Sequence, residues 1–176
     1  MNAPNIYLIG LMGSGKTTLG KSLAKKLNRP FIDTDQLIEQ KSGVDVSMIF
    51  EFEGEVGFRE RETKLLSEIA LKKEHIVSTG GGIILSKYNR DVIAKSGIIF
   101  YLKTQPAELF IRLQNDKTRP LLQGTNLKEK LTKIYAERWP LYEMTADYII
   151  ETKNKKISQI LTNIEEIMTA HENHKN

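Results

Sequence analysis

The sequence predicts a single α/β domain, in which helices cover both faces of a parallel β-sheet. Its length of 176 residues is about that of one domain. Short apolar segments alternate with segments of helical periodicity, a pattern typical of parallel sheets with connecting helices. The apolar segments are rich in Ile, Val, Tyr and Phe and lack strict alternation. We therefore expect strands that are buried on both faces.

The predicted elements follow one another along the chain. Five segments are predicted as strands: residues 6–9, 31–32, 75–77, 98–102 and 148–150. Helical patterns cover residues 17–27, 36–41, 58–71, 90–95, 106–112, 127–135 and 156–168. The domain is expected to span residues 1–170, with a mobile lid at about 114–126, where Asn, Asp, Thr, Pro and Gly gather. The polar tail, 171–176, is expected to fray, which would leave His171 and His174 idle on the surface.

Composition argues against several classes of protein. Hydrophobic residues make up 40% and charged residues 27%, as in ordinary globular proteins. Apolar runs stay well short of the roughly 20 residues of a membrane helix, and the amino terminus lacks a secretory signal. We therefore expect a cytoplasmic protein without a membrane partner. The absence of cysteine excludes disulfides and thiolate zinc sites. The net charge of +4 lies in short basic groups without interleaved aromatics, which argues against a nucleic-acid partner.

Residues 10–17, GLMGSGKT, match the phosphate-binding pattern G-x-x-x-x-G-K-[ST] in full. They follow a predicted strand and precede a predicted helix, which is the context that this P-loop motif requires. Main-chain amides of the loop and of the helix start would surround the phosphates, Lys16 would reach the β- and γ-phosphates, and the hydroxyl of Thr17 would bind Mg²⁺. We expect ATP to contact Gly13, Ser14, Gly15, Lys16, Thr17 and Thr18.

A P-loop alone does not separate kinases from GTPases and motor ATPases. The chain contains neither D-x-x-G nor [NT]-K-x-D, which argues against a GTPase, and its apolar runs do not end in Asp-Glu as in many motors. The expected class is a kinase of a small molecule. A regulatory protein that binds ATP without an acceptor remains the alternative from another class.

Asp33 and Asp35 stand two residues apart at the end of a predicted strand. In an extended chain such residues point to the same side, so both carboxylates could face a site at the carboxyl edge of the sheet. One would hold Mg²⁺ through water, and the other would accept the proton of an attacking hydroxyl. The alternative is that Thr34 or Asp35 caps the following helix.

Three further signals are weak when each is taken alone. Gly80-Gly81-Gly82 would expose main-chain amides to a ligand, although a plain strand-to-helix turn explains the triplet equally well. Arg59 and Arg138 would grip a carboxylate if they converged on one pocket. Arg119, in the expected lid, could reach the γ-phosphate as charge builds during transfer.

Taken in order, these motifs resemble those of the shikimate kinase family. The motifs are GxxGxGKT, FIDTD, GExxFRxxE, GGG, RPLL and RxPLY, and they lie within residues 6–142. The resemblance implies ATP-dependent phosphorylation of the 3-hydroxyl of shikimate, a step of chorismate and aromatic amino-acid synthesis. It also implies a five-stranded parallel sheet of order 2-3-1-4-5, of the nucleoside-monophosphate-kinase type, with a lid that closes over ATP. We expect a monomer.

The resemblance also implies roles for the matching residues. Thr17 and Asp33 would serve Mg²⁺, and Asp35 would contact the shikimate hydroxyls and act as the base. The residues implied to bind shikimate are Asp35, Arg59, Gly81 and Arg138. Arg119 would contact the phosphates of ATP, and Arg112 would stack on adenine. The catalytic set is then Lys16, Asp35 and Arg119.

Two departures and one alternative stand beside this resemblance. Ile150-Glu151-Thr152 replaces a V/I-D-T segment that family members tend to follow with proline, so adenine contacts from residues 153–157 stay open. Gly57 could loosen its helix, because Gly costs on the order of 1 kcal/mol there relative to Ala. The alternative is a kinase of another small hydroxy acid such as gluconate, which would keep the P-loop but not the Arg59 and Arg138 motifs.

Overall fold

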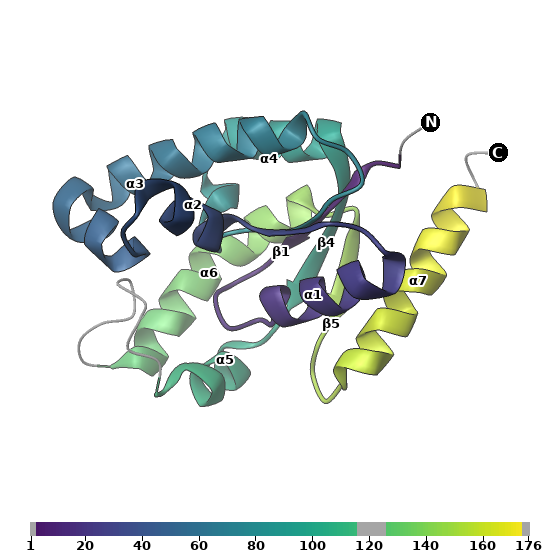
Figure 1. Ribbon diagram of the computed structural model, residues 1–176. Coiled ribbons are helices and arrows are strands. Elements are labelled where there is room, and N and C mark those ends of the chain that lie inside the picture. The colour runs from purple at the N-terminus through teal and green to yellow at the C-terminus, as the bar shows by residue number, and fades with distance from the viewer. Residues whose placement is uncertain (1–2, 116–125, 174–176) are drawn as a thin grey trace.

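The computed structural model describes residues 3–115 and 126–173, in which five parallel strands form one sheet (Figure 1). The strands are β1 (Asn5–Ile9), β2 (Phe31–Asp33), β3 (Ile76–Ser78), β4 (Gly97–Lys103) and β5 (Tyr148–Glu151). Their order in the sheet is β2-β3-β1-β4-β5, and every pairing is parallel. The order implied by the resemblance is therefore confirmed.

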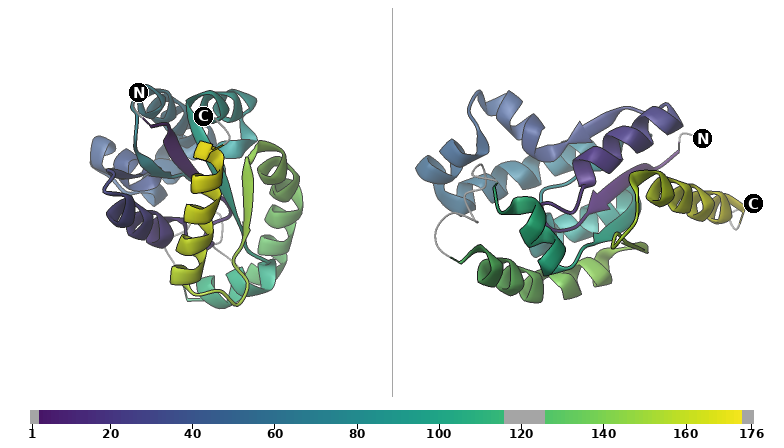
Figure 2. Two further views of the ribbon diagram at one scale, coloured as in Figure 1. Left: turned by 90° about the vertical axis from the view of Figure 1, so that its right-hand side faces the viewer. Right: turned by 90° about the horizontal axis from the view of Figure 1, so that it is seen from below.

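Helices cover both faces of the sheet. They are α1 (Lys16–Leu27), α2 (Thr34–Ser42), α3 (Val46–Ala70), α4 (Lys87–Ser96), α5 (Pro106–Leu113), α6 (Leu127–Thr145) and α7 (Ile157–Asn173), with a 3₁₀ turn, η1 (Ile83–Leu85). Figure 2 shows α1 and α7 on one side of the sheet and α6 on the other. In the described part of the chain, no helix is both long and apolar enough to cross a membrane.

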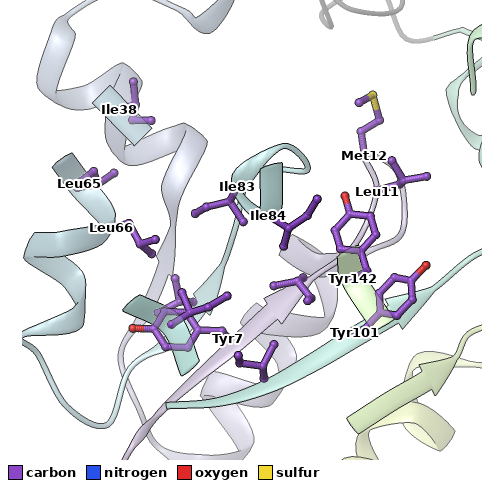
Figure 3. Close-up of a cluster of buried hydrophobic side chains, with 14 of the residues drawn as sticks. Tyr7, Leu11, Met12, Ile38, Leu65, Leu66, Ile83, Ile84, Tyr101 and Tyr142 are labelled. Carbon is purple, nitrogen blue, oxygen red and sulfur yellow. The ribbon is translucent and has the colours of Figure 1, made fainter. Parts of the chain in front are cut away.

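The central strand β1 is buried along its whole length because each of its faces packs into a different core. Ile6 and Leu8 join the apolar side chains of α1 and α7. Tyr7 and Ile9 join the larger cluster of α3, α4 and α6, part of which Figure 3 shows. Burial on both faces is the reason why the strand reads as a continuous apolar run.

Helix α3 starts earlier than the predicted helix at 58–71 and is broken at Gly54. The backbone of Gly54 has φ 69° and ψ −176°, outside the helical region, so the segment 46–53 and the rest of the helix meet at an angle. A Cβ atom at Gly57, one turn later, would lie 2.5 Å from Cβ of Glu53. The chain before the break lies so close to residue 57 that a glycine is needed at position 57. Any loosening of the helix by Gly57 stays a prediction.

The carboxyl-terminal helix also differs from its prediction. It continues to Asn173, past the boundary expected at 171, and His171 lies one turn after Met168, the last of the buried residues Ile160, Ile164 and Met168. Nδ1 of His171 lies 2.7 Å from the hydroxyl of Tyr148. The expectation that His171 is idle in a frayed tail is therefore wrong. His174 and most of the expected lid, including Arg119, lie outside the described residues.

Candidate active site

The loop between β1 and α1 has the backbone of a phosphate cradle. Gly10, Gly13 and Gly15 have φ of 146°, 77° and 96°, values that side-chain-bearing residues rarely adopt. Gly15 precedes the first residue of α1, and no side chain caps the helix there. The amide groups at the helix start, with the positive end of its dipole, are therefore available to an anion.

Lys16 is folded back onto this loop. Its Nζ donates hydrogen bonds to the carbonyl oxygens of Gly10 at 2.8 Å and Leu11 at 2.9 Å, and the residue is only 7% exposed. The loop therefore holds a buried cation within itself. Phosphate oxygens that enter the loop would exchange for these carbonyls as partners of the ammonium group, which is a charge-assisted and stronger contact.

The side-chain oxygens of Thr17 and Asp33 lie side by side. The Thr17 hydroxyl donates to Oδ2 of Asp33 at 2.6 Å, whereas Oδ1 of Asp33 accepts from the amides of Asp35 and Gln36. Asp33 is therefore the cap of α2, and the hypothesis that Thr34 or Asp35 caps this helix is wrong. Among the described residues, no cluster of three or more His, Cys, Asp or Glu could hold a metal. A hydroxyl and one carboxylate fit Mg²⁺, which usually keeps several waters and binds substrate phosphates.

Asp35 is positioned by a helix and not by the strand that the sequence suggested. It lies in the first turn of α2 instead of on the strand, so the extended-chain argument does not apply to it. Gly80 makes room for it, since a Cβ there would lie 2.8 Å from Oδ1 of Asp35 and 2.3 Å from Oε1 of Glu62. The amide of Gly80 is itself bonded to Oγ1 of Thr34 at 2.9 Å. Gly80 therefore serves the site by leaving space for the carboxylates of Asp35 and Glu62, and its amide is not exposed to a ligand as the glycine-triplet hypothesis suggested.

Arg59 of α3 is held by two carboxylates. Its Nη1 donates to Oε2 of Glu62 at 2.8 Å, and its Nε and Nη2 donate to Oε1 of Glu55 at 3.2 and 3.0 Å. Burial lowers the pKa of Arg59, but Glu62 and Glu55 more than reverse this, so its pKa lies above the ordinary value. Glu62 is fully buried; burial raises its pKa and the charge of Arg59 opposes the rise. The guanidinium is therefore charged and fixed in place.

Arg138 and Tyr142 of α6 meet at one main-chain oxygen. The Tyr142 hydroxyl donates to the carbonyl of Gly81, and Nη1 of Arg138 donates to the same oxygen at 3.3 Å. Arg138 is 6% exposed and Tyr142 is fully buried. Two residues of α6 thus fix the loop between β3 and η1.

Two adjoining cavities of about 480 and 320 Å³ bring these residues together. The first is lined by the P-loop and α1 start, Arg112, Thr152, Lys155 and Ile157, and the second by Phe50, Phe58, Arg59, Gly82 and Arg138. The residues that line both are Met12, Thr17, Asp33, Asp35 and Gly81. We call the first cavity the donor pocket and the second the acceptor pocket. Arg59 and Arg138 converge on one cavity, as the paired-arginine hypothesis requires.

Residues that were expected or considered as adenine contacts line the donor pocket. Arg112 lines this pocket, and its Nη1 donates to the carbonyl of Gly13 at 3.1 Å, so it is tied to the P-loop. Lys155 and Ile157, from the uncertain segment 153–157, also line it. Sequence reasoning missed the wall residue Met12 and the contact of Tyr142. It also missed the ion pair of Glu62 with Arg59. Glu62 is the last residue of the GExxFRxxE motif and Tyr142 the last residue of RxPLY, so the motifs themselves could have pointed to both residues.

Comparisons with known proteins place the chain in a family. A model of the family described as shikimate kinase matches residues 12–169. The shikimate kinase of Actinobacillus pleuropneumoniae serotype 5b is 44% identical over 164 residues, which are 93% of this chain and 95% of that protein. A solved structure of shikimate kinase from Acinetobacter baumannii in complex with shikimate has a TM-score of 0.93 and 43% identity, and the match covers 96% of this chain and 94% of that chain.

A gluconokinase from Sinorhizobium meliloti 1021 is a more distant likeness. It has a TM-score of 0.55 and 14% identity over 96% of this chain and 97% of that one, which shows a shared fold alone. The matches to shikimate kinases are far closer and span nearly the whole chain. The chain therefore belongs to the shikimate kinase family.

Proposed function

We infer that this chain transfers the γ-phosphoryl group of ATP to the 3-hydroxyl of shikimate, giving shikimate 3-phosphate and ADP. The observation that carries this inference is the junction of the two pockets, where Asp35 and Gly81 line a phosphate cradle on one side and a two-arginine cavity on the other. A donor and an acceptor bound in these pockets would meet at this junction. The relative from A. baumannii was solved with shikimate bound.

In the donor pocket, the protein's task is to hold and neutralise phosphate. The P-loop amides, the start of α1 and Lys16 surround the place where the phosphates would lie. Thr17 and Asp33 would hold Mg²⁺, which when bound supplies positive charge to the phosphate oxygens. Phosphoryl transfer needs little covalent chemistry from the protein, so positioning and electrostatics supply most of the acceleration.

In the acceptor pocket, charge and shape select an acid with hydroxyl groups. Arg59 and Arg138 present two guanidinium groups, which suit one carboxylate. Asp35 faces both pockets, so it can accept the proton of the hydroxyl that attacks the γ-phosphate. Holding that hydroxyl in line with the phosphate converts a bimolecular encounter into a positioned reaction.

Release of ADP in the presence of different acceptors tests this function. We expect rapid release with shikimate and only background release with gluconate or nucleoside monophosphates. The two arginines suit any small carboxylate, but the chain is 43–44% identical to shikimate kinases and only 14% identical to a gluconokinase. A larger rate with gluconate would favour the other hydroxy-acid kinase. Tight ATP binding without stimulation by any acceptor would favour the regulatory protein.

Alanine at Gly82 should weaken shikimate binding specifically. A Cβ atom there would lie 2.2 Å from Nη2 of Arg59, so the guanidinium would have to leave its place between Glu55 and Glu62. We expect KM for shikimate to rise about tenfold or more, with KM for ATP almost unchanged, because a misplaced charged group loses much of its hydrogen-bond energy. Steady-state kinetics with each substrate varied would show this. Equal changes in both KM values would contradict it.

A further inference from the structure

The Tyr142 hydroxyl is a buried polar group for which the mechanism above has no use. It belongs to α6, four residues after Arg138, so the two side chains lie on one face of the helix. Both donate to the carbonyl oxygen of Gly81, and the bond from Arg138, at 3.3 Å, is long. One main-chain oxygen thus has two donors, one of which also belongs to the pair expected to bind the substrate carboxylate.

The ring of Tyr142 is held rigidly. It stacks on Tyr101 of β4 with ring centroids 4.9 Å apart and planes 16° apart, and Figure 3 shows the two rings together near Leu11 and Met12 of the P-loop. Burial raises the pKa of Tyr142 far above its ordinary value, although Arg138 opposes the rise. The hydroxyl therefore keeps its proton and acts as a donor. Stacking on Tyr101 and full burial keep the ring in the orientation that directs its hydroxyl at the Gly81 carbonyl.

Gly81 is the residue through which this contact reaches the site. It lines both pockets, and a Cβ there would lie 3.2 Å from the amide nitrogen of Met12 and 3.5 Å from the carbonyl oxygen of Gly10. The glycine therefore lies directly against the P-loop backbone. The hydrogen bonds that fix the Gly81 carbonyl therefore also fix the main chain that lines both the donor pocket and the acceptor pocket.

We propose that Tyr142 is a positioning residue, whose hydroxyl satisfies the Gly81 carbonyl so that Arg138 stays available to the substrate carboxylate. A buried carbonyl that loses a donor becomes costly, and it would draw the remaining donor closer. Without the Tyr142 hydroxyl, Arg138 is that donor, so Gly81 and the substrate would compete for one guanidinium. The proposal rests on the proposed function, since it assigns Arg138 to the carboxylate of shikimate.

The variant Tyr142→Phe tests the proposal because it removes one oxygen and keeps the ring. We expect KM for shikimate to rise about tenfold, equivalent to about 1.4 kcal/mol. We expect KM for ATP and kcat to change by less than about threefold, because the lost contact affects ground-state binding of the acceptor. Calorimetric titration of shikimate, performed well below the Tm of each variant, should show the same loss of affinity. A KM for shikimate equal to that of wild type would overturn the proposal.

Tyr101→Phe is the matched control. It makes the same change in the other ring of the stacked pair, and no hydrogen bond joins the Tyr101 hydroxyl to Gly81. We expect this variant to keep the wild-type KM for shikimate. If it raised that KM as much as Tyr142→Phe does, the effect would come from packing of the pair, and the positioning role would be rejected.

A double-variant cycle tests whether Tyr142 acts through Arg138. In an Arg138→Met background, Tyr142→Phe should change the affinity for shikimate by less than about twofold, because residues that share one interaction are not additive. A full tenfold loss in both backgrounds would contradict the proposed route. Turnover of shikimate by the wild-type protein tests the proposed function separately, so failure of that function and failure of this role give different results.

Discussion

Asp35→Asn should lower kcat with shikimate by about 10²- to 10⁴-fold, the usual contribution of a positioned general base. Asparagine keeps the size of the side chain and one of its oxygens, so a neutral amide would still lie where the two pockets join. We therefore expect the affinity for shikimate to change much less than kcat. Rapid-quench measurement of phosphoryl transfer, with calorimetry for binding, separates the two quantities.

The control for this variant is Asp91→Asn, an exposed residue of α4 whose carboxylate pairs with Lys87. It makes the same chemical change at a distance from both pockets and should leave kcat at the wild-type value. If Asp35→Asn turned over shikimate at the wild-type rate, Asp35 would not be the general base. The proton would then leave with the transferred phosphoryl group or with water.

Arg59→Met should damage both substrate binding and the fold. Removal of Arg59 takes away the hydrogen-bonded counter-ion of the fully buried Glu62 and leaves only the weaker influence of Arg138, and breaking a buried ion pair in this way costs about 3–5 kcal/mol of stability. For a chain of this size that corresponds to a fall in Tm of about 2–4 °C per kcal/mol. The affinity for shikimate should fall by about 10²-fold or more, as when a hydrogen-bonded charge pair is truncated.

The stability loss in Arg59→Met should depend on pH. Burial raises the pKa of Glu62, and Arg59 opposes this more strongly than Arg138 does, so loss of Arg59 raises the pKa of this buried carboxyl further in the folded state. A carboxyl whose pKa is higher in the folded than in the unfolded state loses stability as the pH rises through that interval. The variant should therefore be less destabilised, relative to wild type, at pH 5 than at pH 8. Denaturant unfolding at the two pH values measures this.

Two further variants interpret this result. Arg59→Met combined with Glu62→Gln should recover much of the stability, because the fully buried side chain at position 62 is then neutral, yet it should not recover shikimate binding. Arg61→Met is the matched control, since Arg61 lies on the same helix and pairs with the exposed Glu53. Exposed pairs contribute about 0–1 kcal/mol, so this variant should resemble wild type in both properties. Similar losses in Arg59→Met and Arg61→Met would contradict the special role of the buried pair.

The parts of this protein that could be predicted are those that depend on residues close together in sequence. The P-loop needs a strand, three glycines with positive φ and a helix start, and all of them lie within a few residues of Gly13. Alternation of apolar and helical segments predicted the parallel sheet for the same reason. The strand order came only from the resemblance, because pairing such as that of β1 with β4 joins distant segments.

Contacts between distant residues could not be predicted from local patterns. Tyr142 and Gly81 are 61 positions apart, and their shared hydrogen bond depends on how α6 lies against the sheet. Local patterns were also ambiguous. Asp33, Thr34 and Asp35 are all residue types that can cap a helix, and only the geometry identifies Asp33 as the cap of α2. The break at Gly54 was missed because the apolar pattern of α3 becomes regular only from Phe58 onward.

The central claim is that a phosphoryl group passes from the donor pocket to an acceptor in the adjoining pocket. ³¹P and ¹H NMR spectroscopy of ATP, Mg²⁺, shikimate and the purified protein tests it most directly. The account predicts a new phosphomonoester whose phosphorus couples to the proton on carbon 3 of shikimate, formed in the same amount as ADP. Inorganic phosphate as the sole new phosphorus species beside ADP, or ATP left intact with shikimate present, would contradict it.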